Sequence, residues 1–267
     1  MHPVQGHDLH FRHAIRHAIQ SKQFVLHFQP QICLRSGRLM GAEALVRWAH
    51  PEKGLLMPDR FIPAAERSTL IIDIGREVID MACSQIAHWS QKGLAPFPVS
   101  ANLSARDIEQ VDLPDFVARS LAQYRVAPSQ LRFEVTESLL SVNPDTAAGI
   151  LWELSAMGVL IALDDFGTGY SNLVCMQRYP IHMLKLDRAF VRDVASSESA
   201  RELTRAVVSL GKALGLKVLA EGVETDWQRD FLLHVGCDKA QGFYFSPPLD
   251  ACGLETFVHG HAPTVRQ

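Results

Sequence analysis

Short apolar runs rich in β-branched residues recur along the chain, and segments of helical character separate them. This alternation is typical of parallel sheets and wound barrels. Strands are expected at Phe24–Gln29, Leu39–Glu43, Val99–Asn102, Leu131–Glu134, Val159–Asp164, Met183–Asp187, Val218–Glu221 and Lys239–Gly242. Helices are expected at Asp8–Ser21, Leu70–Gln91, Pro114–Arg125, Pro144–Met157, Glu198–Leu214 and Thr225–Val235. The pattern therefore predicts an α/β fold.

The first two expected strands are joined by Leu34–Arg38, which is too short for a crossover helix. They should pair antiparallel as a hairpin, whereas the remaining strands can be parallel. A closed α/β barrel of about 250 residues is a single unit, so one domain is the simplest interpretation. We expect a linker or helix over residues 1–20, the barrel over 21–258 and a disordered tail over 259–267.

Composition narrows the class of protein. The 267 residues are 47% hydrophobic and 21% charged, which fits a globular protein with a sizeable core. The net charge of -3 predicts no broad basic face for duplex nucleic acid. No apolar run approaches the ~18 residues of a membrane-spanning helix. The five cysteines include no Cys-x-x-Cys pair and their number is odd, so we expect a reduced, cytoplasmic protein without membrane insertion.

Polar side chains stand at or near the ends of seven expected strands. They are Glu43, Asn102, Glu134, Asp164 (followed by Asp165), Lys185, Glu221 and Gln241. In a barrel these strand ends meet at one rim, where such folds place their active sites. Any one of these residues would ordinarily be a solvated rim side chain. Seven in register indicate a functional site.

Five of these side chains are carboxylates, and like charges at one rim would push some of them to take up protons. Bound cations would relieve the repulsion. Carboxylate and amide oxygens, without Cys or His, favour Mg²⁺ or Mn²⁺ over a structural zinc. The structural alternative is a salt-bridge network around Lys185, but one lysine cannot balance five acids.

Two further features are weak by themselves. The segment Asp164–Ser171 is rich in glycine, but it lacks the pattern of a Walker loop or a dinucleotide fingerprint. Arg47 lies four residues beyond Glu43, where the strand is expected to give way to a loop, and its guanidinium could pair with a phosphate there.

Taken together, seven ordered motifs resemble the EAL-domain cyclic di-GMP phosphodiesterases from about Phe24 to Pro248. The motifs are Glu43–Arg47, Asn102–Ser104, Phe133–Ser138, Asp164–Gly169, Lys185–Asp187, Ala220–Glu224 and Gln241–Gly242. The resemblance implies a modified TIM (β/α)8 barrel whose first strand is antiparallel, in agreement with the hairpin. It also implies hydrolysis of cyclic di-GMP to linear pGpG with Mg²⁺ or Mn²⁺, through two ions.

The resemblance also implies a set of metal ligands. Glu43, Asn102, Glu134 and Asp164 correspond to the ligands of one ion. Asp164 would bridge to a second ion, which Asp165 also holds.

Roles for the other residues follow from the same resemblance. Glu221 corresponds to the general base, and Lys185 to the residue that orients the attacking water or neutralises its charge. Gln241 is similar to a polar residue near the second ion, and Arg47 to a phosphate contact. Glu137 corresponds to a glutamate that anchors the glycine-rich loop. The helix after that loop, roughly Ser171–Arg178, could join a dimer surface, and an upstream sensor domain could regulate it.

Two alternatives remain open at this point. The chain could be a receptor that binds cyclic di-GMP without cutting it, although intact Glu43, Lys185 and Glu221 speak against this. It could also be a different metal-dependent barrel enzyme, such as a lyase that uses lysine as a base on a carboxylate substrate. The Asp164–Asp165 pair and the placement of Arg47 favour a phosphodiester.

Overall fold

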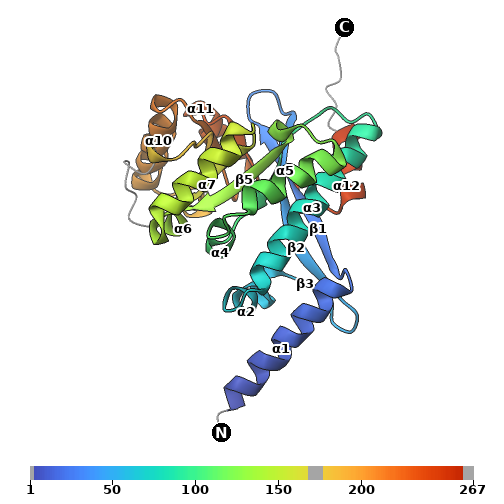
Figure 1. Cartoon of the computed structure of the whole chain (residues 1–267). Helices are drawn as coiled ribbons and strands as arrows, with labels where there is room; N and C mark the ends of the chain where they lie inside the picture. Colours follow the sequence, from blue (N-terminus) through green and yellow to red (C-terminus); the bar gives the residue numbers. More distant parts are fainter. Residues whose placement is uncertain (1–2, 168–176, 261–267) are drawn as a thin grey trace.

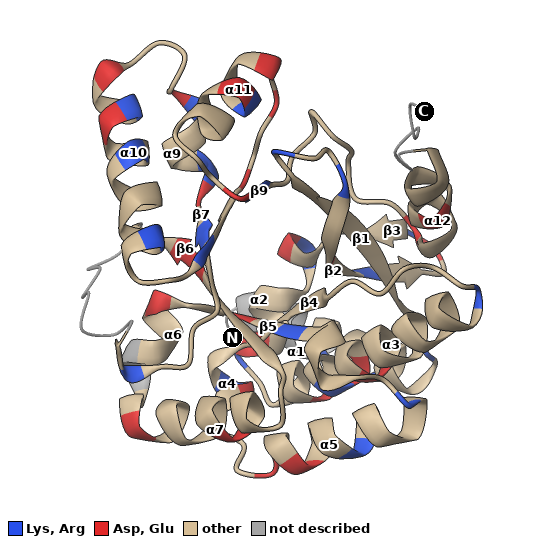
Figure 2. Ribbon diagram, turned by 90° about the horizontal axis from the view of Figure 1, so that it is seen from above, with Lys and Arg blue, Asp and Glu red and all other residues tan. Residues whose placement is uncertain are grey.

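The computed structural model describes residues 3–167 and 177–260, and a sheet that closes on itself lies at its centre (Figure 1). Its strands are β1 (Phe24–Cys33), β2 (Leu39–His50), β3 (Gly54–Leu56), β4 (Val99–Asn102), β5 (Leu131–Thr136), β6 (Leu160–Phe166), β7 (Met183–Leu186), β8 (Lys217–Ala220) and β9 (Lys239–Ala240). The helices are α1 (Pro3–Gln20), α2 (Ile62–Glu66), α3 (Leu70–Gln91), α4 (Ala105–Ile108), α5 (Leu113–Tyr124), α6 (Glu137–Val142), α7 (Pro144–Ala156), α9 (Arg188–Arg192), α10 (Glu198–Ala213), α11 (Asp226–His234) and α12 (Ala251–Gly260). Seen from above, α3, α5, α7, α10 and α11 lie outside the strands (Figure 2).

The strand order confirms the predicted barrel. The hydrogen-bonded order is β1-β9-β8-β7-β6-β5-β4-β2-β3, and an additional pairing of β1 with β2 closes the ring. The pairs from β2–β4 to β8–β9 are parallel, whereas β1 is antiparallel to both β2 and β9. Gly37, with φ of 68°, lies in the short turn between β1 and β2. The fold is therefore a TIM-like barrel whose first strand is reversed.

Four strands, β1, β2, β5 and β6, extend further than the sequence pattern predicted, and the extensions of β2 and β6 affect the polar residues at the strand ends. β2 runs on to His50, so Glu43 lies inside it and Arg47 lies on a strand, where Val25 is its cross-strand partner. The prediction of a loop at Arg47 is wrong because the hairpin of β1 and β2 stays paired as far as Phe24 and Trp48. β6 continues to Phe166 through an irregular register.

Side chains alternate between the inside and the outside of the barrel along the regular parts of the strands. Outward residues such as Val99, Phe133 and Leu184 are fully buried in the main core between the strands and the helices. Their neighbours point inward, because successive strand residues face opposite sides of a sheet. The seven polar residues at or after the strand ends share this inward parity, and so do the residues two positions before them. The latter are Gly41, Ser100, Arg132, Ala162, Met183, Leu219 and Lys239.

The N-terminal helix α1 packs on the barrel through its second half. Ile15 and Ala18 are fully buried, and the ring of Phe11 lies 5.8 Å from the ring of Trp48 on β2. At the other end of the chain α12 continues to Gly260, so the expected tail begins inside a helix and its remaining residues, 261–267, lie outside the described part. Among the described helices, none has the length and apolar character needed to cross a bilayer.

Candidate functional site

The inward-facing polar residues gather at the end of the barrel where the parallel strands terminate, which we call the mouth. Glu43, Glu134, Asp164 and Lys185 lie on β2, β5, β6 and β7, and all four are at least nine-tenths buried. Asn102 ends β4, while Glu221 and Gln241 directly follow β8 and β9. The structure therefore brings together the polar side chains that the strand-end pattern singled out, because the ends of neighbouring parallel strands meet at one edge.

Lys185 is the centre of the cluster. Its Nζ lies 2.9 Å from Asp164 Oδ2, 2.7 Å from Glu221 Oε1 and 3.6 Å from Glu43 Oε2, and it also donates to Glu134 Oε2. The lysine side chain is only 1% exposed. One buried cation therefore faces four carboxyl groups.

Two amides hold the carboxylates from the side. Asn102 Nδ2 donates to Glu43 Oε1 over 3.0 Å, and Gln241 Nε2 donates to Glu43 Oε2 over 2.7 Å. Gln241 Nε2 also lies 3.1 Å from Glu221 Oε1. Both oxygens of Glu43 therefore accept a hydrogen bond, and Gln241 links the carboxylate on β2 with the one after β8.

Burial and crowding shift the acid–base properties of these groups. Burial, reinforced by the charge of Glu43, raises the pKa of Glu134 to about 8. Burial also raises the pKa of Glu221 to about 7, with Lys185 opposing it. Burial alone would raise the pKa of Glu43, but Lys185 and the two amides bring it below its ordinary value. For Lys185, burial acts to lower the pKa, yet the four carboxylates raise it well above the usual range.

Asp165 turns away from this buried cluster. Its backbone has φ of 53°, and its backbone N–H donates to Asp164 Oδ1 over 2.9 Å. The side chain is exposed, although partial burial and the charge of Asp164 raise its pKa. Asp164 thus faces the barrel axis, and Asp165 stands beside it at the surface.

Arg47 lies four residues beyond Glu43 on β2, and the two side chains are on the same side of the strand. It is buried, and its Nη1 donates to the carbonyl oxygen of Val46 over 2.9 Å. Its Nε is buried and has no hydrogen-bond partner within the described part of the chain. The guanidinium therefore retains donor capacity for an anion.

Glu137 reaches the start of the glycine-rich segment. It is the first residue of α6, which directly follows β5, and its Oε1 accepts the backbone N–H of Gly167 over 3.3 Å. Gly167 has φ of 90°, and an added Cβ would lie 2.3 Å from the ring of Phe190. Residues 168–176, and with them most of the helix expected over Ser171–Arg178, lie outside the described residues.

The donor set fits a divalent cation, although the side chains are not arranged as a finished metal site. Among the described residues no three Asp, Glu, His or Cys side chains form one, and four carboxylates converge on Lys185 instead. Glu134 Oε1 is nevertheless buried without a hydrogen-bond partner in the described part. A buried carboxylate oxygen in that position is costly unless it is paired, and hard cations prefer such oxygens.

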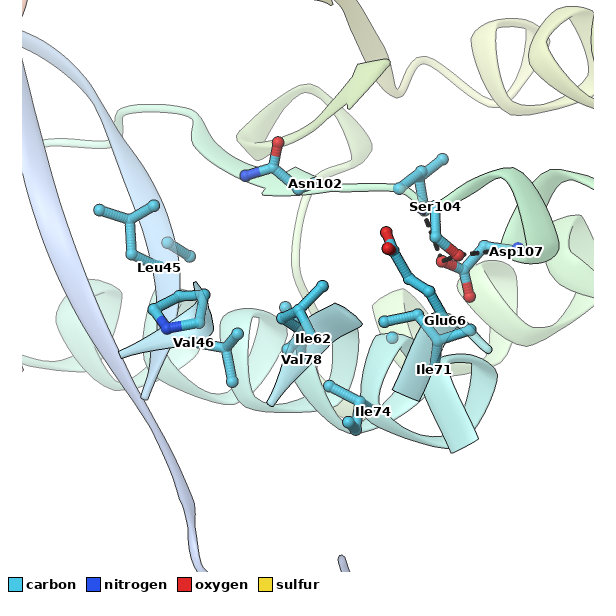
Figure 3. A pocket seen from close by; sticks show the side chains of 14 residues that line it. Leu45, Val46, Ile62, Glu66, Ile71, Ile74, Val78, Asn102, Ser104 and Asp107 are labelled. Carbon is cyan, nitrogen blue, oxygen red and sulfur yellow. Dashed lines mark hydrogen bonds between the residues drawn. The ribbon is translucent and has the colours of Figure 1, made fainter. Parts of the chain in front are cut away.

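The structure also reveals two features that the sequence interpretation missed. A cavity of about 260 Å³ lies between β2 and the helices α2 and α3. Its walls are aliphatic, and Asn102 borders it together with Ser104 and Glu66, so it adjoins the mouth (Figure 3). The second feature is a group of buried polar side chains one layer below the carboxylates, which includes Gln31 and Arg132. The sequence signal for Arg132 is its position two residues before Glu134.

The sequence matches a known protein family over most of its length. The family model described as "EAL domain" matches residues 12–248. The bifunctional diguanylate cyclase/cyclic di-GMP phosphodiesterase MucR of Pseudomonas aeruginosa is 43% identical over 244 residues, which are 91% of this chain and 36% of that protein. The cyclic di-GMP phosphodiesterase PdeR of Escherichia coli is 39% identical over 241 residues, or 90% of this chain and 36% of that protein. The chain thus spans about a third of the length of these relatives.

A solved structure supports the same relationship. The Pseudomonas aeruginosa MucR phosphodiesterase in complex with c-di-GMP superimposes with a TM-score of 0.87 at 42% sequence identity. The match covers 92% of this chain and 99% of that one. The reversed first strand and the remaining barrel therefore have a close counterpart in a known structure.

Proposed function

Because the chain belongs to the EAL domain family, we propose that it is a divalent-metal-dependent phosphodiesterase that hydrolyses cyclic di-GMP to linear pGpG. The observation that carries the proposal is the convergence of four carboxylates on one buried lysine at the mouth. The names of the relatives MucR and PdeR support the substrate.

We assign the metal ligands as the motifs suggest. Glu43, Asn102, Glu134 and Asp164 would hold one Mg²⁺ or Mn²⁺ ion, and Asp164 and Asp165 a second. Such ions supply positive charge for the phosphate and lower the pKa of water. The convergence of four carboxyl groups on the single cation Lys185 and the unpartnered Glu134 Oε1 support this assignment.

The protein side chains would carry the proton transfer and the positioning of the substrate. Glu221 accepts a proton from the attacking water as the new P–O bond forms and the bond from phosphorus to the 3′ oxygen breaks. The 3′ oxygen leaves with a proton from solvent. Lys185 and Gln241 both contact Glu221 Oε1 and hold it in place. Arg47 contributes guanidinium donors to a phosphate of the substrate.

Turnover of the purified chain with cyclic di-GMP tests this function directly. Chromatography should detect pGpG when Mn²⁺ or Mg²⁺ is present. Binding of cyclic di-GMP without any product would instead identify a receptor, and cleavage of organic acids but not of cyclic di-GMP would identify a different barrel enzyme.

We expect activity to depend on added metal. After exhaustive chelation and dialysis, pGpG formation should fall to background, and Mg²⁺ or Mn²⁺ should restore it, because one lysine leaves the carboxylates undercompensated. Calcium should inhibit, since its larger and looser coordination disturbs a paired-metal geometry. The assay compares the three ions at matched ionic strength. Full activity in the chelated protein would reject the metal requirement.

We expect Glu137→Ala to lower kcat by about tenfold or more and to raise the Mg²⁺ concentration at half-activity. The substitution removes the acceptor for the Gly167 N–H, and Gly167 lies two residues after Asp165. A Mg²⁺ titration of kcat measures both effects, and the melting temperature should stay close to that of the parent.

The matched control for this variant is Glu198→Ala. Glu198 is also the first residue of a helix and follows a serine N-cap, as Glu137 follows a threonine N-cap. It should leave the metal titration unchanged. A lower melting temperature in Glu137→Ala, with unchanged kcat and metal midpoint, would mean that Glu137 serves only the fold.

We further propose that the protein acts in the cytoplasm as a homodimer and that an upstream sensor domain regulates it. The greater length of the relatives supports additional regulatory sequence. Light scattering of the purified protein, with and without cyclic di-GMP, tests the dimer.

A further inference from the structure

A chain of hydrogen bonds connects the mouth to the layer beneath it. Arg132 Nη1 donates to Gln31 Oε1 over 3.0 Å, and Gln31 Nε2 donates to Gln241 Oε1 over 3.2 Å. Gln241 Nε2 then donates to Glu43 and Glu221. Arg132 and Gln31 are 3% and 0% exposed, so water does not compete for these groups.

The two ends of this chain determine its direction. A guanidinium group can only donate hydrogen bonds, and an ionised carboxylate can only accept them. Each of the two amides between them has one accepting and one donating end. All the contacts are satisfied only if the oxygen of Gln31 faces Arg132 and the oxygen of Gln241 faces Gln31. A reversed Gln241 would place its oxygen against the carboxylate oxygens of Glu43 and Glu221.

We propose that Arg132 and Gln31 are positioning residues, which orient the Gln241 side-chain amide so that its nitrogen donates to Glu43 and Glu221. The catalytic consequence rests on the proposed function, whereas the orientation itself does not. Arg132 and Gln31 act through Gln241 and do not touch the substrate.

The composition of the lower layer supports this role. On the far side of the barrel the same layer is apolar, and Ala162, Met183 and Leu219 form a small cluster of their own. Packing alone would allow an apolar side chain at position 132 as well. Instead Arg132 is buried, and its Nε lacks a hydrogen-bond partner in the described residues. A buried cation at this cost points to a need for a donor at that place.

Gly41 supplies the space for Gln31. It precedes Glu43 by two residues on β2, and a Cβ added there would lie 2.6 Å from Gln31 Oε1. The backbone oxygen of Pro98 would lie 3.2 Å from the same Cβ. An alanine at position 41 would therefore push the Gln31 amide away from Arg132 without changing any member of the chain.

The substitution Gln31→Glu tests the direction of the chain. A glutamate keeps the size and still accepts from Arg132, but its second oxygen faces Gln241 and requires a donor there. Gln241 would have to reverse. We expect kcat for cyclic di-GMP with Mn²⁺ to fall about 10- to 100-fold, with the melting temperature near that of the parent. Gly41→Ala should change kcat in the same direction and covers the case in which Gln31→Glu fails to fold.

The control substitution is Lys239→Met. Lys239 also lies in the lower layer, two residues before Gln241. Its Nζ donates to the carbonyl oxygen of Met40 over 3.2 Å and takes no part in the chain of hydrogen bonds from Arg132 to Glu43 and Glu221. The kcat of Lys239→Met should stay close to that of the parent.

A double substitution tests whether Gln31 acts through Gln241. Gln31→Glu should cause no further loss of kcat in a Gln241→Ala background, because the effects of residues that act through a shared partner are not additive. Additive losses would overturn the proposal.

The orientation can also be measured without substrate. The side-chain amide signals of Gln241 in a ¹H–¹⁵N spectrum, assigned by their loss in Gln241→Ala, should shift in Gln31→Glu and Gly41→Ala but not in Lys239→Met. Unchanged Gln241 signals in both of the first two variants would overturn the proposal. A parent protein that cleaves no cyclic di-GMP would reject the proposed function, and the spectra would still decide the orientation.

Discussion

Replacing Glu221 by glutamine should lower kcat for cyclic di-GMP by at least about 100-fold, the lower limit for loss of a general base. Glutamine keeps the shape of the side chain but cannot accept the proton of the attacking water. Glu221 lies at the mouth, where Lys185 and Gln241 hold its Oε1. Because the fold and the other substrate contacts remain, binding of cyclic di-GMP should be largely retained. Chromatography of pGpG gives kcat, and calorimetry in the presence of Ca²⁺ gives the affinity.

The matched control is Glu153→Gln, the same substitution at an exposed position on α7. It should not change kcat. If Glu221→Gln turned over substrate at the parental rate, another group would have to accept the proton.

The second large effect is expected from Lys185→Met. Removal of the only cation that contacts four carboxylates among the described residues leaves their charges without compensation. Breaking a buried ion pair by removal of one partner costs on the order of 3–5 kcal/mol. We expect a loss of unfolding free energy of that order in urea denaturation, together with loss of pGpG formation. Mg²⁺ should recover part of the stability, because a ligand of the native state stabilises it.

Lys217→Met provides the comparison for this effect. Lys217 pairs with Asp238 at 3.1 Å, but its side chain is 66% exposed. Exposed pairs contribute only about 0–1 kcal/mol, so this variant should unfold almost as the parent does. An equally small change in Lys185→Met would show that the carboxylates lose their charge at little cost, and the role given to Lys185 would be wrong.

The sequence predicted the barrel because strand and helix periods alternate clearly along it. The five-residue connection Leu34–Arg38 was enough to predict the reversed first strand, since no crossover fits into it. The predicted end of β2 at Glu43 was wrong. No Gly or Pro marks the end of a strand before Pro51, and β2 continues to His50. The length of that strand depends on pairing with β1, which is a tertiary contact that a local pattern does not contain.

The strand-end pattern indicated which polar side chains gather at the mouth, but not how they contact one another. Strand ends place Glu43 and Glu134 at one rim, yet the sequence does not say that both turn to Lys185. The lower polar layer was missed for a different reason. Arg132 and Gln31 alternate with apolar neighbours, as solvent-facing residues of a half-buried strand do. Only the closure of the sheet turns that polar face toward the inside of the barrel.

The reversed first strand also determines where the chain enters the domain. In a barrel of eight parallel strands, the first strand begins at the end opposite the active site. Here Phe24 pairs with Trp48, beyond Glu43 in the direction of the mouth, so the polypeptide enters the barrel at the end that carries the mouth. α1 delivers it there, with the Phe11 ring against Trp48, the residue next to Arg47. α1 therefore contacts the barrel next in sequence to the guanidinium assigned to the substrate phosphate, and not at the base of the barrel.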